Sequence, residues 1–255
     1  MPRPTTTRSS PPGLSHAPIT AHNRLAIIRP TAAQAALREI SYFGRIDSTL
    51  RMFTPRIKAI IFDFGGVLVD WNPHNLYRHF FDESRKIDEF LSEIQFSEWN
   101  LQQDKGRPFA EGVAELSARF PQHASLIRAY HEHWEDSIVG PIPGSVEILR
   151  ALKAAGYGIY GLSNWSAETF PVAYRKYDFF ELLDGYIISG DVRLVKPDPA
   201  IFDLIIEKIG YLARECLLID DSVKNIEAAN QLGFETILFR SSDQLGAELR
   251  KLGLL

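Results

Sequence analysis

Short apolar runs alternate with amphipathic segments over much of the chain after residue 56, and this alternation is the first indication of its fold. Most of the apolar runs close on glycine or a polar residue, as buried parallel strands do. The segments between them carry apolar residues at helical spacing, and several stop at a glycine. The predicted strands are residues 57–64, 157–164, 185–190, 215–221 and 235–239. The predicted helices are residues 145–156, 166–176, 197–210, 222–233 and 242–252.

Strands that alternate with helices are joined by right-handed crossovers, so the strands lie parallel in one sheet. The expected fold class is α/β, with a doubly wound, Rossmann-like parallel sheet. Residues 74–137 interrupt this alternation, because they show helical patterns and no comparable strand run. We therefore expect a core of residues 52–70 and 141–255, with residues 71–140 forming a helical bundle inserted after the first strand.

The N-terminal residues 1–51 differ from the rest in composition. They contain seven arginines, no lysine and two acidic residues, which gives a net charge of +5, and the rest of the chain carries −9. Arg-rich, acid-poor N-termini occur in organelle transit peptides, although a start at Met52 would also explain the difference. We expect a disordered extension rather than a folded domain.

Composition excludes several classes of protein. The chain has 45% hydrophobic and 24% charged residues, which is ordinary for a globular protein. A net charge of −4 argues against a nucleic-acid partner, and no apolar stretch reaches the ~18 residues that span a bilayer. The single cysteine, Cys216, rules out an internal disulfide framework and is expected to pack in the interior. A cytoplasmic enzyme without a membrane or nucleic-acid partner is the expectation.

Polar residues end several of the predicted strands. Asp63 follows the first strand, Ser163 ends the second, and Asp220 and Asp221 end the fourth, while Lys196 lies in a loop before a helix. Ligands of open parallel sheets bind outside the carboxyl ends of the strands, so these side chains are expected to meet there. Any one of them is commonplace at a turn; an acid, a hydroxyl, a lysine and paired acids in this order are not.

Charge then indicates the chemistry of such a site. Carboxylates that lie close together repel one another unless a cation neutralises them, and Mg²⁺ prefers oxygen ligands together with phosphate. Lys196 adds a positive charge, Ser163 adds a hydroxyl donor, and the backbone N–H groups of residues 64–66 and 164–165 form a candidate anion-binding nest. These groups suit a phosphoryl group, with Asp63 free to act as nucleophile.

Four short motifs carry a family resemblance. The segments "DFGGV" (63–67), "LSN" (162–164), "KPD" (196–198) and "IDDS" (219–222) match, in order, the motifs of the haloacid dehalogenase superfamily of hydrolases. The match covers roughly residues 57–240, and the helical insert resembles the family's helical-bundle cap. Within the superfamily the chain is similar to small sugar-phosphate phosphatases and to the phosphatase domain of soluble epoxide hydrolases.

This resemblance implies a role for each motif residue. Asp63 is the implied nucleophile, and Lys196 pairs with it and with the phosphate of a small phosphorylated metabolite. Ser163 and Asn164 are implied to hold the phosphoryl oxygens. The implied Mg²⁺ ligands are Asp63, the backbone oxygen of Gly65, Asp221 and Asp220, the last of them directly or through water.

Gly65 departs from the pattern of most phosphatases in the family, which carry a second aspartate at this position. That acid protonates the leaving oxygen, and such help is worth roughly 10²–10⁴-fold in rate. Two interpretations follow. A phosphatase acts on a good leaving group or takes its proton from the cap or from water, whereas a metal-free 2-haloacid dehalogenase expels halide and needs no proton.

The fourth motif favours the phosphatase. Dehalogenases resemble one another in carrying serine, serine and asparagine where this chain has Asp220, Asp221 and Ser222. Two extra negative charges would raise the pKa of the nucleophile and repel a haloacid anion. A non-catalytic binding protein on the same fold is the third alternative, and the acidic residues and lysine of the motifs argue against it.

Several residues of the insert are candidates for contact with the leaving group. Trp71, Asn72 and His74 follow the first motif closely, and His74 is the candidate replacement proton donor. Their alternative role is a turn at Asn72 followed by helix packing. Trp134 is expected to pack the insert against the core.

Overall fold

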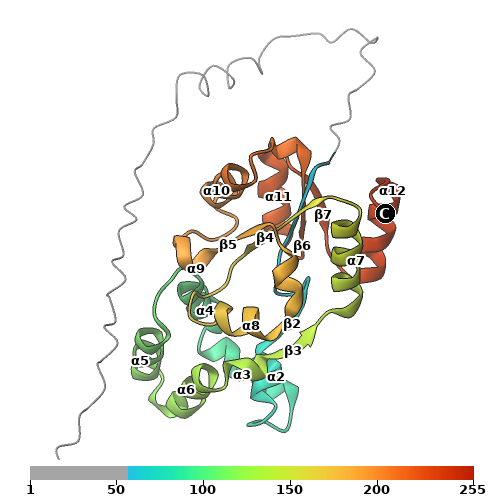
Figure 1. Cartoon of the computed structure of the whole chain (residues 1–255). Coiled ribbons are helices and arrows are strands. Elements are labelled where there is room, and N and C mark those ends of the chain that lie inside the picture. Colours follow the sequence, from blue (N-terminus) through green and yellow to red (C-terminus); the bar gives the residue numbers. More distant parts are fainter. Residues whose placement is uncertain (1–56) are drawn as a thin grey trace, which may run out of the picture. The chain divides into compact units, whose positions relative to one another are not determined.

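A parallel sheet forms the centre of the structure, a computed structural model that describes residues 57–255 (Figure 1). Its five strands are β1 (Ala59–Phe62), β4 (Gly158–Ser163), β5 (Gly185–Ile188), β6 (Cys216–Asp220) and β7 (Glu235–Leu238). They lie in the order β5-β4-β1-β6-β7, and every neighbouring pair is parallel. The order reverses direction beside β1, so the predicted doubly wound α/β fold is confirmed.

Alternate residues of the central strands face opposite sides of the sheet, and both sides are buried. In β1, Ile60 and Phe62 belong to one apolar cluster, while Ala59 and Ile61 belong to the other. All four side chains are inaccessible to solvent. The neighbouring strand β6 divides in the same way, and Cys216 lies buried in the second cluster, as predicted. Burial on both faces explains why these strands are continuously apolar in sequence.

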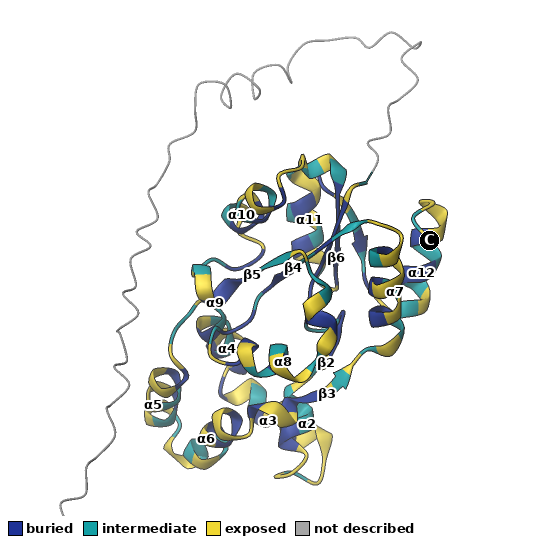
Figure 2. Cartoon of the chain, in the orientation of Figure 1, coloured by how far each residue is buried: buried dark blue, intermediate teal, exposed yellow. Residues whose placement is uncertain are grey.

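Helices cover both faces of the sheet. The first face is covered by α7 (Pro143–Ala154) and α12 (Ser242–Lys251), and the second by α10 (Pro199–Ile209) and α11 (Val223–Gln231). Figure 2 shows buried residues in the strands and exposed residues on the outer sides of these helices. Pro199 opens α10 at a position where its missing N–H costs nothing, and Asp198 caps that helix by accepting the N–H of Ala200 at 2.9 Å. The shorter helices α8 (Phe170–Lys176) and α9 (Ser189–Val192) follow β4 and β5.

The segment between the first two sheet strands is helical, as its sequence pattern predicts. It contains α2 (Pro73–Tyr77), α3 (Ser84–Glu93), α4 (Phe96–Asp104), α5 (Phe109–Arg119) and α6 (Ala124–Glu132). These helices pack around buried aromatic rings, among them Tyr77, Phe90 and Tyr130. Figure 1 shows them gathered at one end of the sheet.

A two-stranded antiparallel ribbon joins this insert to the sheet, and the sequence pattern did not predict it. It consists of β2 (Val69–Trp71) and β3 (Ile138–Pro141). Both strands are too short to give a periodic signal, and they pair only because the chain returns after the insert. The expected core and insert boundaries fall within this ribbon. The expected N-terminal extension, residues 1–51, lies outside the described residues.

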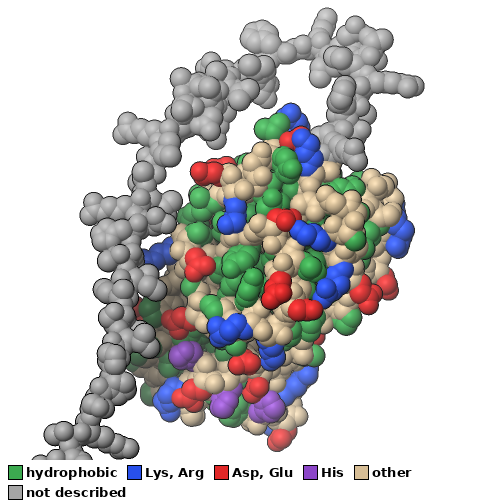
Figure 3. All heavy atoms as spheres, in the orientation of Figure 1, with side chains coloured by type: hydrophobic (Ala, Val, Ile, Leu, Met, Phe, Trp, Pro, Cys, Tyr) green, Lys and Arg blue, Asp and Glu red, His purple; other side chains and the backbone are tan. Residues whose placement is uncertain are grey.

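Opposite charges lie close together on the surface of the described residues. Acidic and basic side chains are interspersed on the face seen in Figure 3. Examples of exposed pairs are Arg150 with Asp178 at 2.9 Å and Lys153 with Asp184 at 2.6 Å. Such pairs contribute little to stability individually. Among the helices of residues 57–255, none has both the length and the apolar character needed to cross a membrane.

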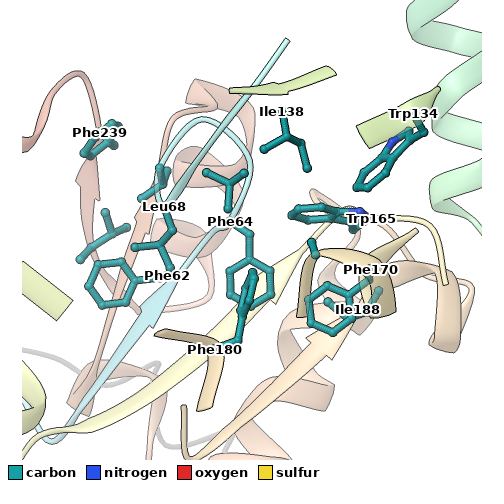
Figure 4. Packing of buried hydrophobic residues seen from close by; sticks show 14 of the residues in the cluster. Phe62, Phe64, Leu68, Trp134, Ile138, Trp165, Phe170, Phe180, Ile188 and Phe239 are labelled. Carbon is teal, nitrogen blue, oxygen red and sulfur yellow. The ribbon is translucent and has the colours of Figure 1, made fainter. Parts of the chain in front are cut away.

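An aromatic cluster anchors the loop that follows β1. The ring of Phe64 stacks on Phe170 with centroids 5.7 Å apart and meets Phe180 edge-on at 4.9 Å (Figure 4). Trp165 lies edge-on at 6.3 Å. Gly161 of β4 makes room for the ring, because a Cβ there would lie 2.1 Å from Phe64 Cζ. Sheet and aromatic cluster together therefore fix the position of Phe64.

The variant Gly161→Ala tests this anchor. Its added methyl group displaces the Phe64 ring, so we expect the free energy of unfolding to fall by about 1–3 kcal/mol, measured by urea denaturation. Gly158→Ala in the same strand is the matched control, since its Cβ comes closest to the edge of the partly exposed Tyr160 ring, at 3.0 Å, and does not touch Phe64. Equal losses in the two variants would contradict the anchoring role of Phe64.

Candidate active site

The loop after β1 turns sharply behind Asp63. The N–H of Asp63 donates to Ile219 O at 2.9 Å and so continues the sheet by one residue. The N–H of Val69 then donates to Phe64 O at 2.8 Å, and the N–H of Gly66 donates to Val69 O at 2.9 Å. Gly66 has a φ of +75°, in the left-handed region that favours glycine. The buried Phe64 ring thus fixes a tight loop beside the Asp63 carboxylate.

Asp63 is 8% exposed, and its carboxylate receives three donors. Its Oδ1 accepts the N–H of Phe64 at 2.7 Å and the hydroxyl of Ser163 at 2.8 Å. Its Oδ2 lies 2.9 Å from Lys196 Nζ. Burial raises the pKa of Asp63 to about 7; Lys196 opposes the rise, and the acids at the end of β6 add to it. The structure therefore brings together the predicted aspartate, serine and lysine.

Lys196 bridges two carboxylates in the interior. Its Nζ lies 2.6 Å from Asp220 Oδ2 in addition to its contact with Asp63. Burial lowers the pKa of Lys196, but the two negative charges outweigh burial and leave this pKa raised, so the amine stays charged. Asp220 Oδ1 in turn accepts the N–H of Ser222 and the amide of Asn225, each at 2.9 Å. Sequence reasoning missed Asn225, whose only signal was a polar residue in the first turn after the fourth motif.

The side chain of Asn164 positions Lys196 by hydrogen bonding to the backbone of the lysine. Asn164 Oδ1 accepts the N–H of Lys196 at 2.8 Å, and Asn164 Nδ2 donates to Lys196 O at 3.0 Å. This reciprocal pair ties the end of β4 to the loop before α10. The predicted phosphate contact of Asn164 stays a prediction, and its side-chain amide already has these two partners.

Three of the backbone N–H groups predicted to bind an anion have partners within the protein. Phe64 donates to the Asp63 carboxylate, Gly66 donates to a loop carbonyl, and Trp165 donates to Ser189 Oγ at 2.9 Å. The predicted nest thus narrows to the N–H groups of Gly65 and Asn164. These two lie on the loops that follow β1 and β4, which are neighbouring strands.

The predicted metal ligands form a cluster of carboxylates. Asp63, Asp220 and Asp221 each offer an oxygen, and these oxygens lie within 4.8 Å of one another. Partial burial and the negative charge of Asp220 raise the pKa of Asp221. Lys196 supplies one positive charge against these three acids. The cluster therefore fits a hard divalent cation, which prefers oxygen donors and would supply the missing charge.

A small cavity of about 70 Å³ opens beside Gly65 and Asn164. Five aromatic side chains line it, namely Trp71, Phe109, Tyr130, Trp134 and Trp165. The rings of Trp134 and Trp165 lie 5.8 Å apart, so the predicted packing of Trp134 against the sheet domain is confirmed. Among the described residues of the lining, Asp104 is the one acidic or basic side chain. Sequence reasoning did not single out Asp104, which ends α4.

The candidates after the first motif have different surroundings. Trp71 lines the cavity, whereas Asn72 caps α2 by accepting the N–H of His74 at 2.9 Å. The imidazole of His74 pairs with Asp88 at 3.0 Å and lies outside the cavity lining. The choice of His74 as replacement proton donor is therefore not supported, because helix α2 turns it toward α3.

A sheet of this topology with an acid, lysine and paired acids at its carboxyl edge defines a class of hydrolases. The chain belongs to the haloacid dehalogenase-like hydrolases, whose family model matches residues 57–233. The predicted superfamily is therefore confirmed.

Proteins similar to this chain include both phosphatases and dehalogenases. It is 26% identical over 200 residues to the sesquiterpene phosphatase astK of Aspergillus oryzae, with 76% of this chain and 96% of the relative covered. It is 25% identical over 197 residues to the (S)-2-haloacid dehalogenase 4A of Burkholderia cepacia, with 71% and 82% covered. A magnesium complex of the family enzyme bt-2542 of Bacteroides thetaiotaomicron matches with a TM-score of 0.62 at 25% identity, covering 76% of this chain and 98% of that one.

The variants Gly66→Ala and Gly65→Ala test which glycine of the loop is required by its backbone conformation and its neighbours. A Cβ at Gly66 would lie 2.3 Å from Asp221 Oδ2 and would be strained at positive φ, so we expect unfolding free energy to fall by at least about 1–2 kcal/mol. A Cβ at Gly65 meets nothing within 4 Å, so we expect a change within about 0.5 kcal/mol. Urea denaturation measures both, and a stable Gly66→Ala protein would show that the loop is not constrained there.

Proposed function

We propose that the chain is a Mg²⁺-dependent phosphatase that hydrolyses a small phosphorylated metabolite through an aspartyl-phosphate on Asp63. The observation that carries this proposal is the cluster of Asp63, Asp220 and Asp221, in which the buried Lys196 contacts the first two acids. Three acids and one ammonium group leave an excess of negative charge, and a divalent cation with a phosphoryl group complements it. The phosphatase and the magnesium-bound enzyme among the similar proteins support the same chemistry.

Each site residue has a task in the proposed reaction. The Asp63 carboxylate attacks phosphorus, the bond from phosphorus to the leaving oxygen breaks, and water later attacks the same phosphorus to release phosphate and restore Asp63. Ser163 and Lys196 hold Asp63 in position and face the phosphoryl oxygens, joined by the N–H groups of Gly65 and Asn164. Bound Mg²⁺, held by the three acids and the carbonyl of Gly65, would supply charge neutralisation.

The surroundings of Asp63 favour a phosphatase over a dehalogenase. A haloacid substrate carries its own carboxylate, which a cation in the substrate cavity would stabilise. Among the described residues that line this cavity, no lysine or arginine occurs, and Asp104 adds an acid. Asp220 and Asp221 would repel such a substrate further unless a metal ion balanced them. The same charges suit a metal-bound phosphate ester.

The arrangement of the insert supports a further part of this proposal. Residues 71–140 would form a helical cap over a core of residues 52–70 and 141–255, since helices of the insert and loops of the sheet line one cavity. The cap would decide which metabolite enters. A cytoplasmic setting and a disordered extension of residues 1–51 remain predictions from composition.

Metal removal tests the proposed reaction. We expect phosphate release from p-nitrophenyl phosphate with Mg²⁺, loss of that release with EDTA, and recovery with excess Mg²⁺, because the acidic cluster needs its counter-charge. A panel of phosphate esters, sugar phosphates among them, is assayed in the same way. The parallel assay measures chloride release from 2-chloropropionate. Chloride release that survives EDTA would instead establish a dehalogenase. Inactivity on every substrate would leave the non-catalytic binding protein as the remaining alternative.

The variant Asp63→Asn tests the nucleophile. An amide cannot form the acyl phosphate, so we expect kcat to fall by about 10³-fold or more, measured as phosphate release at saturating Mg²⁺. Asp70→Asn is the matched control, because Asp70 is exposed on β2 in the same segment and is absent from the acidic cluster. Substantial activity in Asp63→Asn would assign the nucleophile to another residue.

A further inference from the structure

The proposed reaction lacks one component, a group that gives a proton to the leaving oxygen. Gly65 stands where a side chain could supply it, and a Cβ there would meet nothing within 4 Å. This open space adjoins the aromatic cavity, since Gly65 is part of its lining. A donor on another element therefore has access to the region that an acid at position 65 would occupy.

Asp104 is the acid that lines the same cavity. It is the last residue of α4 in the helical insert, and it is partly exposed while the aromatic walls around it are largely buried. Asn100 Nδ2 donates to Asp104 Oδ2 at 3.1 Å, and Asn100 Oδ1 accepts the hydroxyl of Tyr130 at 3.3 Å. The side chain is thus oriented by a short hydrogen-bonded chain.

The backbone around Asp104 is attached to the sheet domain. Ser189 Oγ, at the start of α9, donates to Asp104 O at 2.6 Å. Two residues on, Gly106 has a φ of +90°, and a Cβ there would lie 2.7 Å from the carbonyl oxygen of Gly190. This close backbone approach holds the end of α4 at a fixed place relative to the loops that carry the site. The backbone of Asp104 is therefore tied to the loop after β5.

We propose that Asp104 donates the leaving-group proton in place of the acid that Gly65 lacks, for esters of alcohols with an apolar group. This inference rests on the proposed phosphatase function. The alcohol portion would lie between the aromatic walls, with its oxygen between phosphorus and Asp104. Aromatic side chains favour hydrocarbon over the hydroxyl groups of a sugar, so the substrate class is an alkyl or alkenyl phosphate.

The protonation state of Asp104 suits a donor. Burial, together with the negative charge of Asp63, raises the pKa of Asp104 to about 8, while the backbone N–H of Ser166 opposes the rise. The carboxyl group is consequently protonated at neutral pH. A general acid works best when its pKa lies near the working pH.

Asp104 gives up one proton and regains one in each catalytic cycle. As Asp63 attacks phosphorus and the bond to the leaving oxygen breaks, the Asp104 proton passes to that oxygen, which gives the alcohol and an Asp104 carboxylate. Water then loses a proton to Asp104 as it attacks the phosphoryl group on Asp63. Phosphate leaves, Asp63 is restored as a carboxylate, and Asp104 is protonated again. The net reaction is ester plus water to alcohol plus phosphate.

The variant Asp104→Asn tests the inference with two substrates. Butyl phosphate has a strongly basic leaving oxygen that needs a proton, whereas p-nitrophenolate leaves without one. We expect kcat/KM, which reports phosphoryl transfer to Asp63 and not the later hydrolysis in which Asp104 is the base, to fall in Asp104→Asn by about 10²–10⁴-fold on butyl phosphate and by less than about threefold on p-nitrophenyl phosphate. Glu98→Gln is the matched control, since Glu98 lies on the same helix, is exposed and is absent from the cavity lining. It should leave both rates within about threefold of the wild type.

A second variant separates proton donation from structural support. Gly65→Asp added to Asp104→Asn places a carboxyl group in the open space beside Gly65, and we expect at least about tenfold recovery of kcat/KM on butyl phosphate. Equal losses of kcat/KM on both substrates, or no loss on butyl phosphate, would overturn the role of Asp104 while leaving the phosphatase intact. A wild type that releases phosphate from no ester would overturn the proposed function itself.

Discussion

A buried ammonium group between two carboxylates is the interaction on which the site depends. Lys196 is 3% exposed and contacts Asp63 and Asp220, which end neighbouring strands of the sheet. An unpaired charge in such a place costs several kcal/mol, so neither the lysine nor the acids are stable there alone. Asn164 holds the backbone of the lysine, and Asn225 holds Asp220. Four segments far apart in sequence are thereby fixed around one carboxylate that is free to react.

The sequence was sufficient to predict this cluster because parallel strands end at a common edge. The runs before Asp63, Ser163 and Asp220 are continuously apolar, which identifies them as strands buried on both faces, and topology then brings their ends together. The position of Lys196 followed from its place between a strand and a helix that starts with prolines. The apolar pattern of the strands and the topology of the sheet point to the same cluster, so it could be predicted without knowledge of tertiary packing.

Other parts depend on tertiary packing and had no local signal. The ribbon of β2 and β3 forms between segments separated by the whole insert, and each strand is too short for a periodic pattern. Asp104 is one acid among many on amphipathic helices, and its significance comes from the contact of α4 with Ser189. For His74 the sequence signal was misleading. Its closeness in sequence to the first motif suggested that it donates a proton to the leaving group, but its contact with Asp88 does not support that role.

The glycine at position 65 therefore has a consequence beyond the loss of an acid. It leaves open the space between the nucleophile and the aromatic cavity, and the walls of that cavity come largely from the insert. An aspartate at this position would let the core supply the proton and would leave the insert only to select the leaving group. If Asp104 supplies it here, proton donation and selection reside in the same helices. A change that reshapes the cavity would then alter both together, and the core would retain only the transfer of the phosphoryl group.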